Sequence, residues 1–209
     1  MRLRGCLAPL VVIVLCSAGC DAMQQATLVP KQKLTSQEKE RISNAIASRN
    51  HSTLRAIGKQ AVPMIIKAVL DIANDSAKSR SVTVSSDACN FIHDLGAIRD
   101  PRAVPALSYI LKDVKKRTFH PAAARALGQI GDKSAVDVLK ISFEREKGYI
   151  AKGNGKGPDY GWGLANDFAY QVAQNAGTAL RRLGQNPGEI PKDKLTQVQE
   201  EFERMKRSR

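Results

Sequence analysis

The chain repeats itself at residues 95–107, which read LGAIRDPRAVPAL, and at residues 127–139, which read LGQIGDKSAVDVL. The two segments are offset by 32 residues and share seven identities: Leu, Gly, Ile, Asp, Ala, Val and Leu. A weaker copy precedes them at 57–65, and a partial copy follows at 179–185. Self-similarity at a fixed period of this length predicts an array of stacked structural units.

The identical positions have the character of helix ends and helix faces. We expect one helix to end near Leu127, with Gly128 or Gly131 in the left-handed turn that follows it. Asp132 then caps the next helix, as Asp100 does in the preceding copy. Apolar residues recur after Asp100 at the i, i+3, i+4 spacing of a helix face, at Val104, Leu107, Ile110 and Leu111. The unit is therefore predicted to be a helical hairpin that buries its apolar face against its neighbours.

These segments resemble HEAT repeats of the short, phycobilin-lyase-like type, over about residues 52–185 and most closely over 87–145. The resemblance implies an all-α fold, an α-α superhelix (a HEAT/armadillo-like solenoid) of about four helical hairpins. It says little about activity, because every identical position is a turn, cap or core position. Some relatives handle tetrapyrroles, but no residue of this chain carries that chemistry over.

Both ends of the array have helix signals of their own. Residues 35–38, TSQE, have the spacing of a capping box and predict a first helix that runs to about Arg49. Residues 191–207 predict a C-terminal capping helix, with Pro191 in its first turn and an apolar stripe at Leu195, Val198, Phe202 and Met205. The last repeat of a solenoid needs such a cover. A two-chain coiled coil is the alternative, for which two heptads are few.

Residues 1–19 have the pattern of a secretory signal. Arg2 and Arg4 precede an apolar run at 7–15, and small residues follow at 17–19. The apolar run is about half the ~20 residues that a membrane-spanning helix needs. The signal therefore predicts export of the domain that follows.

The end of this signal, LCSAGC at 15–20, resembles the lipobox of bacterial lipoproteins. The resemblance implies cleavage before Cys20 and a lipid on Cys20, although Ser17 departs from the Leu, Val or Ile that is usual there. The alternative is ordinary cleavage after Gly19 or Ala22, which gives a soluble secreted protein. We expect a lipid-anchored linker at 20–34, a solenoid domain at 35–209, and a place on the periplasmic or extracellular side of the cell membrane or outer membrane.

The chain is strongly basic, with 33 Lys and Arg against 20 Asp and Glu and a formal charge of +13. Such a balance predicts attraction to anionic partners. Export argues against nucleic acid, and so does the lack of aromatic residues interleaved with the basic ones. An anionic envelope component or a protein partner is therefore expected. The basic clusters at 112–117, 181–182 and 204–209 are interpreted as solvated helix ends.

No catalytic, metal or cofactor site is predicted. The histidines, His51, His93 and His120, lack the spacing of metal ligands. His93 and Asp94 are neighbours, and adjacent residues of a helix do not face each other. His120 precedes a proline and is interpreted as a residue of a helix start. Cys89, which has no partner if Cys20 carries a lipid, is interpreted as a small buried hydrophobic residue.

One irregular segment, 148–163, interrupts the array, because the partial copy at 179–185 comes 56 residues after its match at 123–129. Long insertions in compact domains are often functional. We therefore predict a binding loop whose contact residues are Tyr149, Lys152, Lys156, Tyr160 and Trp162. The alternative is that Trp162 pins the loop to the solenoid itself.

The expected function is that of a non-enzymatic protein-binding or scaffold module. The alternative is a lyase-like protein that handles a small ligand or chromophore.

Overall fold

The computed structural model describes residues 34–75, 78, 81–151, 164–191, 204–205 and 207. The signal segment, Cys20 and nearly all of the linker lie outside these residues. Every regular element of the described part is helical. The α-helices are α1 (Ser36–Ala47), α2 (His51–Ile57), α3 (Val62–Asn74), α5 (Val82–Ile98), α6 (Val104–Lys112), α7 (His120–Ile130), α8 (Val136–Ala151) and α9 (Leu164–Arg182). Short 3-10 helices join some of them: η3 (Gly58–Gln60), η4 (Pro101–Ala103), η5 (Val114–Phe119) and η6 (Lys133–Ala135).

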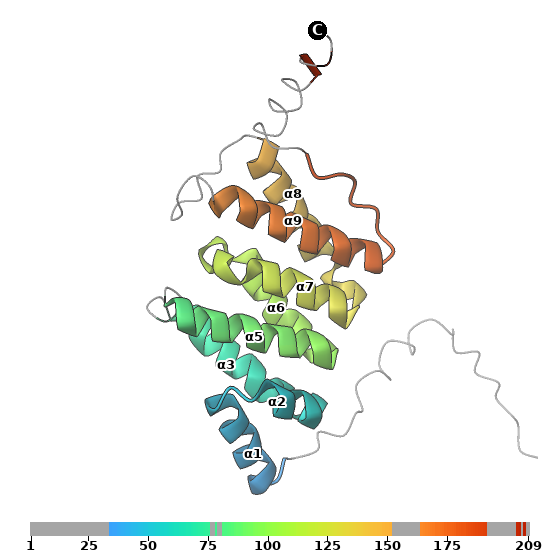
Figure 1. Cartoon of the computed structure of the whole chain (residues 1–209). Coiled ribbons are helices and arrows are strands. Elements are labelled where there is room, and N and C mark those ends of the chain that lie inside the picture. The colour runs from blue at the N-terminus through green and yellow to red at the C-terminus, as the bar shows by residue number, and fades with distance from the viewer. Residues whose placement is uncertain are drawn as a thin grey trace, which may run out of the picture. The chain divides into compact units, whose positions relative to one another are not determined.

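The helices of residues 35–209, which form one compact unit, stack in two rows. A first row contains α2, α5, α7 and α9, and a second row contains α1, α3, α6 and α8. Figure 1 shows α5, α7 and α9 stacked one above another, with α3, α6 and α8 behind them. The predicted all-α solenoid is therefore confirmed.

The hairpins are α1–α2, α3–α5, α6–α7 and α8–α9, because the main contacts between helices that follow one another in the chain lie within these pairs. The turns between α5 and α6 and between α7 and α8 contain Asp100 and Asp132. These turns therefore lead from one hairpin to the next. The sequence pattern predicts each of these turns inside a hairpin, and the structure corrects that prediction.

The predicted caps are present at both turns. The carboxylate of Asp100 accepts a hydrogen bond from the backbone N–H of Arg102 at 2.9 Å, and that of Asp132 accepts one from Ser134 at 2.8 Å. Gly131 has the left-handed conformation after α7, with φ 79°. Arg99 has the same role after α5, with φ 56°, where a side chain costs energy that glycine avoids.

Gly128 has a different function from Gly131, which settles the alternative that the sequence left open. A Cβ on Gly128 would lie 2.8 Å from the Cα of Ala179 on α9. At the equivalent position one repeat earlier, a Cβ on Gly96 would lie 2.9 Å from the Cα of Ala126 on α7. These glycines therefore let consecutive helices of the first row approach closely.

The core confirms the predicted repeat alignment. Leu107 and Leu139, which are 32 residues apart, are both fully buried. The apolar face of α6 is buried as well. The capping box at Thr35 is formed, with its hydroxyl accepting from the N–H of Glu38 and the Glu38 carboxylate accepting from the N–H of Thr35. Among the described residues, no helix combines the length and the apolar character that crossing a membrane requires.

Most of the expected capping helix, 191–207, lies outside the described residues. Arg204 and Met205 are helical, and the exposed fraction of Met205 is 60%. The capping helix stays a prediction.

Candidate functional site

A polar groove of about 550 Å³ crosses the first row of helices. α5, α7 and α9 each contribute several residues to it, and η5 contributes one. Its lining contains hydroxyl, amide and imidazole groups and the guanidinium of Arg125, but no carboxylate. The residues are Ser85, Ser86, Cys89, His93, Thr118, Pro121, Ala122, Arg125, Phe168, Gln171, Gln174 and Asn175. The groove can therefore offer many hydrogen bonds and one positive charge to an occupant.

The groove follows the register of the repeat. His93 on α5 and Arg125 on α7 are 32 residues apart and both line it, as do Cys89 and Pro121. The same face of successive helices thus contributes to one surface. The groove is a property of the stacked array and not of one hairpin.

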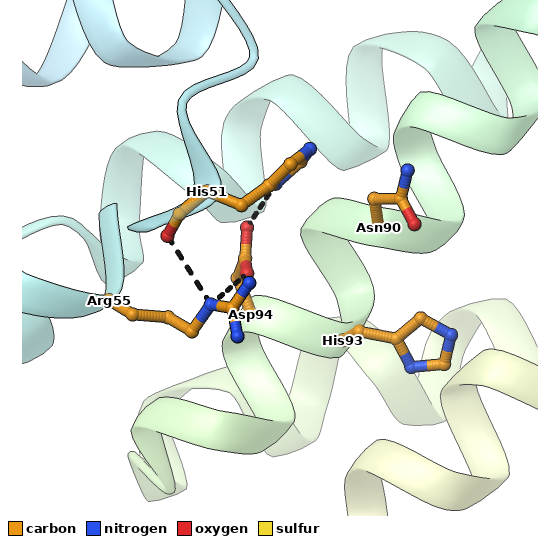
Figure 2. A pocket seen from close by; sticks show the side chains of 5 residues that line it. All are labelled: His51, Arg55, Asn90, His93 and Asp94. Atoms are coloured by element: carbon orange, nitrogen blue, oxygen red, sulfur yellow. Dashed lines mark hydrogen bonds and ion pairs between the residues drawn. The ribbon is translucent and has the colours of Figure 1, made fainter. Parts of the chain in front are cut away.

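A second, smaller hollow of about 180 Å³ lies between α2 and α5 (Figure 2). His93 lines both this hollow and the groove, so the two adjoin at one side chain. Figure 2 shows His51 and Arg55 approaching Asp94, with Asn90 and His93 on the other side of the hollow. We call this hollow the Asp94 pocket; it is lined by His51, Arg55, Asn90, His93 and Asp94.

Asp94 organises this pocket from a nearly buried position. Its side chain is 2% exposed, and each of its oxygens has a basic partner. Nδ1 of His51 lies 2.6 Å from Oδ2, and Nε of Arg55 lies 3.0 Å from Oδ1. The His51 ring also packs against Phe91, with ring centroids 5.3 Å apart. Asp94 therefore fixes the orientation of both basic side chains.

His93 does not join this arrangement as a partner of Asp94, in agreement with the sequence argument that adjacent helical residues do not face each other. Burial is the main cause that lowers the pKa of His93. The positive charge of Arg125 lowers the pKa further, while Asp94 opposes both effects. The His93 ring is therefore neutral at pH 7, and one nitrogen can donate while the other accepts.

Sequence reasoning missed the pairing of His51 with Asp94, because the two residues are 43 positions apart. A signal was nevertheless present in the repeat. Asp94 is equivalent to Ala126, which is fully buried. A carboxylate at a core position of the repeat needs partners, since burying an unpaired charge is costly.

Cys89 lines the groove and is only partly buried. Burial raises the pKa of its thiol to about 11. The thiol therefore stays protonated near pH 7, and it lacks the thiolate that a nucleophilic cysteine needs.

A second polar cluster lies between η5, α7 and α8, and it corrects the interpretation of one basic segment. Glu146 is fully buried and accepts hydrogen bonds from Arg117 at 2.8 Å and Arg145 at 3.0 Å. Lys116 is also buried and binds Asp113. Lys116 and Arg117, two of the four basic residues at 112–117, therefore lie inside the unit and not at a solvated helix end. Asp113 and Glu146 neutralise their charges there.

His120 belongs to this cluster. It is the first residue of α7, as predicted, but its side chain is fully buried. Its ring nitrogens lie 3.0 Å from the carbonyl oxygen of Asp113 and 3.0 Å from a terminal nitrogen of Arg145. Burial, followed by the charge of Arg145, lowers the pKa of His120 to about 4.

The predicted binding loop lies only partly within the described residues. α8 continues to Ala151, so residues 148–151 are helical and not part of a loop. The guanidinium carbon of Arg117 lies over the ring of Tyr149, 4.9 Å from the ring centroid. The other four contact residues, Lys152, Lys156, Tyr160 and Trp162, lie outside the described residues.

In the part of the chain that the structure describes, no group of three or more His, Cys, Asp or Glu could hold a metal ion.

Comparison with protein families adds one finding. Residues 86–153 match the family model of HEAT repeats, a range that begins in α5 and includes α6, α7 and α8. Comparison with curated proteins gave no significant match, and neither did comparison with solved structures. The family match agrees with the resemblance of 87–145 in the sequence and supports HEAT repeats at the centre of the solenoid.

Proposed function

We propose that this chain is a non-enzymatic protein-binding module that a lipid on Cys20 holds at the bacterial cell envelope. The polar groove across α5, α7 and α9 is the observation that carries the binding part of the proposal. Stacked helical repeats offer extended surfaces to partners, and HEAT repeats generally mediate protein–protein interaction or scaffolding. The lipid anchor rests on the lipobox-like residues 15–20.

The composition of the groove favours a peptide segment over a small molecule. Pockets for small molecules are lined mainly by apolar and aromatic side chains with a few polar groups. Here eight of the twelve lining residues have polar or charged side chains, and Phe168 supplies the only phenyl ring among them. Such a surface can satisfy the backbone and polar side chains of an extended partner segment.

Site-specific photo-crosslinking in the native envelope tests the binding part. A photoreactive residue is placed at Gln171, which is exposed and lines the groove, or at Lys140, which is exposed on α8 in the second row. We expect one protein to crosslink from Gln171 and not from Lys140, and the purified chain to bind that protein directly. The same adducts from both positions, or none from Gln171, would refute the groove as the binding surface.

Cell fractionation tests the anchor separately. Wild-type chain is expected in the membrane fraction, and Cys20→Ala is expected to release the mature chain from it. A Cys20→Ala chain that stays membrane-bound and unprocessed would contradict the anchor. If wild-type chain is already soluble, the anchor is wrong and the binding proposal stands on the crosslinks alone.

The alternative function, handling of a small ligand or chromophore, draws support from the Asp94 pocket. The pocket is small, polar and organised by a buried acid. Native mass spectrometry of the chain purified from its own envelope distinguishes the two functions. A stoichiometric small-molecule adduct that is lost in Arg55→Gln would favour the alternative.

A further inference from the structure

We propose that the Asp94 pocket binds a carboxylate, supplied by an acidic side chain of the protein that occupies the neighbouring groove. This inference rests on the proposed function, because it names the chemistry by which the groove selects its partner. The two hollows adjoin at His93, so one segment can contribute to both.

The first argument is the set of hydrogen-bond donors that Asp94 leaves available. Arg55 uses its Nε for Asp94 and for the carbonyl oxygen of His51, 3.3 Å away. Its two terminal nitrogens have no partner among the described residues, and its side chain is 55% exposed. A guanidinium with two free terminal nitrogens matches the geometry of a carboxylate. Asp94 thus orients this group without occupying it.

The second argument is charge. Asp94 is the only acid that lines either hollow, and it is buried and paired through both oxygens. The groups that face an occupant are the cation of Arg55, the amide of Asn90 and the rings of His51 and His93. Arg125 adds a second cation in the adjoining groove. An anionic side chain therefore meets donors and positive charge, with no exposed acid to repel it.

The third argument is size. About 180 Å³ is below the ~300–1,000 Å³ of sites that enclose a drug-sized ligand, and it suits one side-chain head group. From His93 the groove continues along α5 to Ser86, a rise of about 10 Å at ~1.5 Å per residue. That length corresponds to about three residues of extended chain. We therefore expect a short segment with one acidic residue in the Asp94 pocket and polar residues beside it.

NMR of the histidine rings of the full-length chain in detergent tests this proposal. The chain has three histidines, of which two line the pocket, and the third, His120, is fully buried elsewhere. The probe is the α-amide of N-acetylglutamate, its neutral control is the α-amide of N-acetylglutamine, and N-acetylalanine supplies a chain-end carboxylate. We expect the glutamate probe to shift the His51 and His93 resonances in a saturable way and to leave His120 unchanged.

Affinity for the glutamate probe should exceed that for the glutamine control by at least tenfold. Arg55→Gln should lower it at least tenfold, while Lys140→Gln on the second row should not. Equal shifts with glutamine, no saturable shift of His51 at pH 6, or response only to N-acetylalanine would overturn the acidic side chain as the ligand.

Failure of this inference can be told from failure of the proposed function. Crosslinks from Gln171 that persist unchanged in Arg55→Gln, without binding of the glutamate probe, would remove the carboxylate pocket and keep the protein-binding groove. Saturable binding of the probe without any groove crosslink would keep the pocket and remove the proposed function.

Discussion

Gly128→Ala tests the close approach of α7 and α9 on which the stacking of the first row depends. The added Cβ would lie 2.6 Å from the Cβ and 2.8 Å from the Cα of Ala179. Carbon atoms are in favourable contact at ~3.5–4.0 Å, so the two helices must separate locally by about 1 Å. Because one of the opposing atoms is backbone, rotation of a side chain cannot relieve the contact.

Two effects of opposite sign set the expected change in stability. Overpacking of a close interface costs about 1–3 kcal/mol. Replacing glycine with alanine inside a helix stabilises by about 1 kcal/mol. Gly148, inside α8, has no atom within 4 Å of its added Cβ, so Gly148→Ala isolates the second effect. We expect Gly148→Ala to gain up to about 1 kcal/mol and Gly128→Ala to lie ~1–3 kcal/mol below it.

Thermal unfolding of the full-length chain in detergent, followed by far-UV circular dichroism, measures this difference. At ~2–4 °C per kcal/mol for a chain of this size, the two variants should differ in Tm by about 2–12 °C. A Tm for Gly128→Ala equal to or above that of Gly148→Ala would refute the reasoning. It would show that the α7–α9 interface can open without loss.

Four further predictions concern other parts of the chain. Arg99→Gly should raise the free energy of unfolding by about 1 kcal/mol in urea titration, because φ is 56° at that residue. The pKa of His120 is lowered from 6.5 to about 4, so its contribution to stability is present above pH 6.5 and is lost as pH falls toward 4. Between pH 7 and pH 5 the loss should be about 2 kcal/mol, and the lowered pKa of His93 adds to it. Urea titrations of wild type and His120→Gln at both pH values check this, because the variant should lose most of the dependence. Glu146→Gln should destabilise by about 3–5 kcal/mol in the same assay, since it leaves two arginines without their buried acid. Joint replacement of Tyr160 and Trp162 by Ala should weaken partner capture by more than about 1 kcal/mol and leave Tm nearly unchanged. A large loss of stability without an effect on capture would instead place those rings in the solenoid core.

The fold was predictable because its determinants are local and are repeated. Asp100 and Asp132 cap helices through contacts two residues away, and such contacts can be recognised in a short segment. Leu107 and Leu139 follow from the period alone. The two functions of Gly128 and Gly131 could not be separated in this way, since one contacts Ala179 on another helix and the other sets a local turn.

The candidate site was less predictable because its contacts join different hairpins. His51 belongs to the first hairpin and Asp94 to the second, and no local pattern relates them. Arg117 and Glu146, 29 residues apart, likewise meet only when α6–α7 and α8–α9 are stacked. The basic residues at 112–117 suggested a solvated helix end when that segment was considered alone.

The positions at which repeats differ are the ones that locate the site. At equivalent positions of the repeat in the first row, α7 has Ala126 in the core and α5 has the buried Asp94. Alanine at this position suffices for stacking, because Ala126 makes the close contact with Gly96. Burying a carboxylate there is costly unless it is well paired, and replacing buried ion pairs with apolar residues often stabilises a protein. Packing therefore does not account for Asp94. Its two short contacts place His51 and Arg55 beside a groove whose lining contains no acid, and the proposed binding of an anion there would give the buried charge a function.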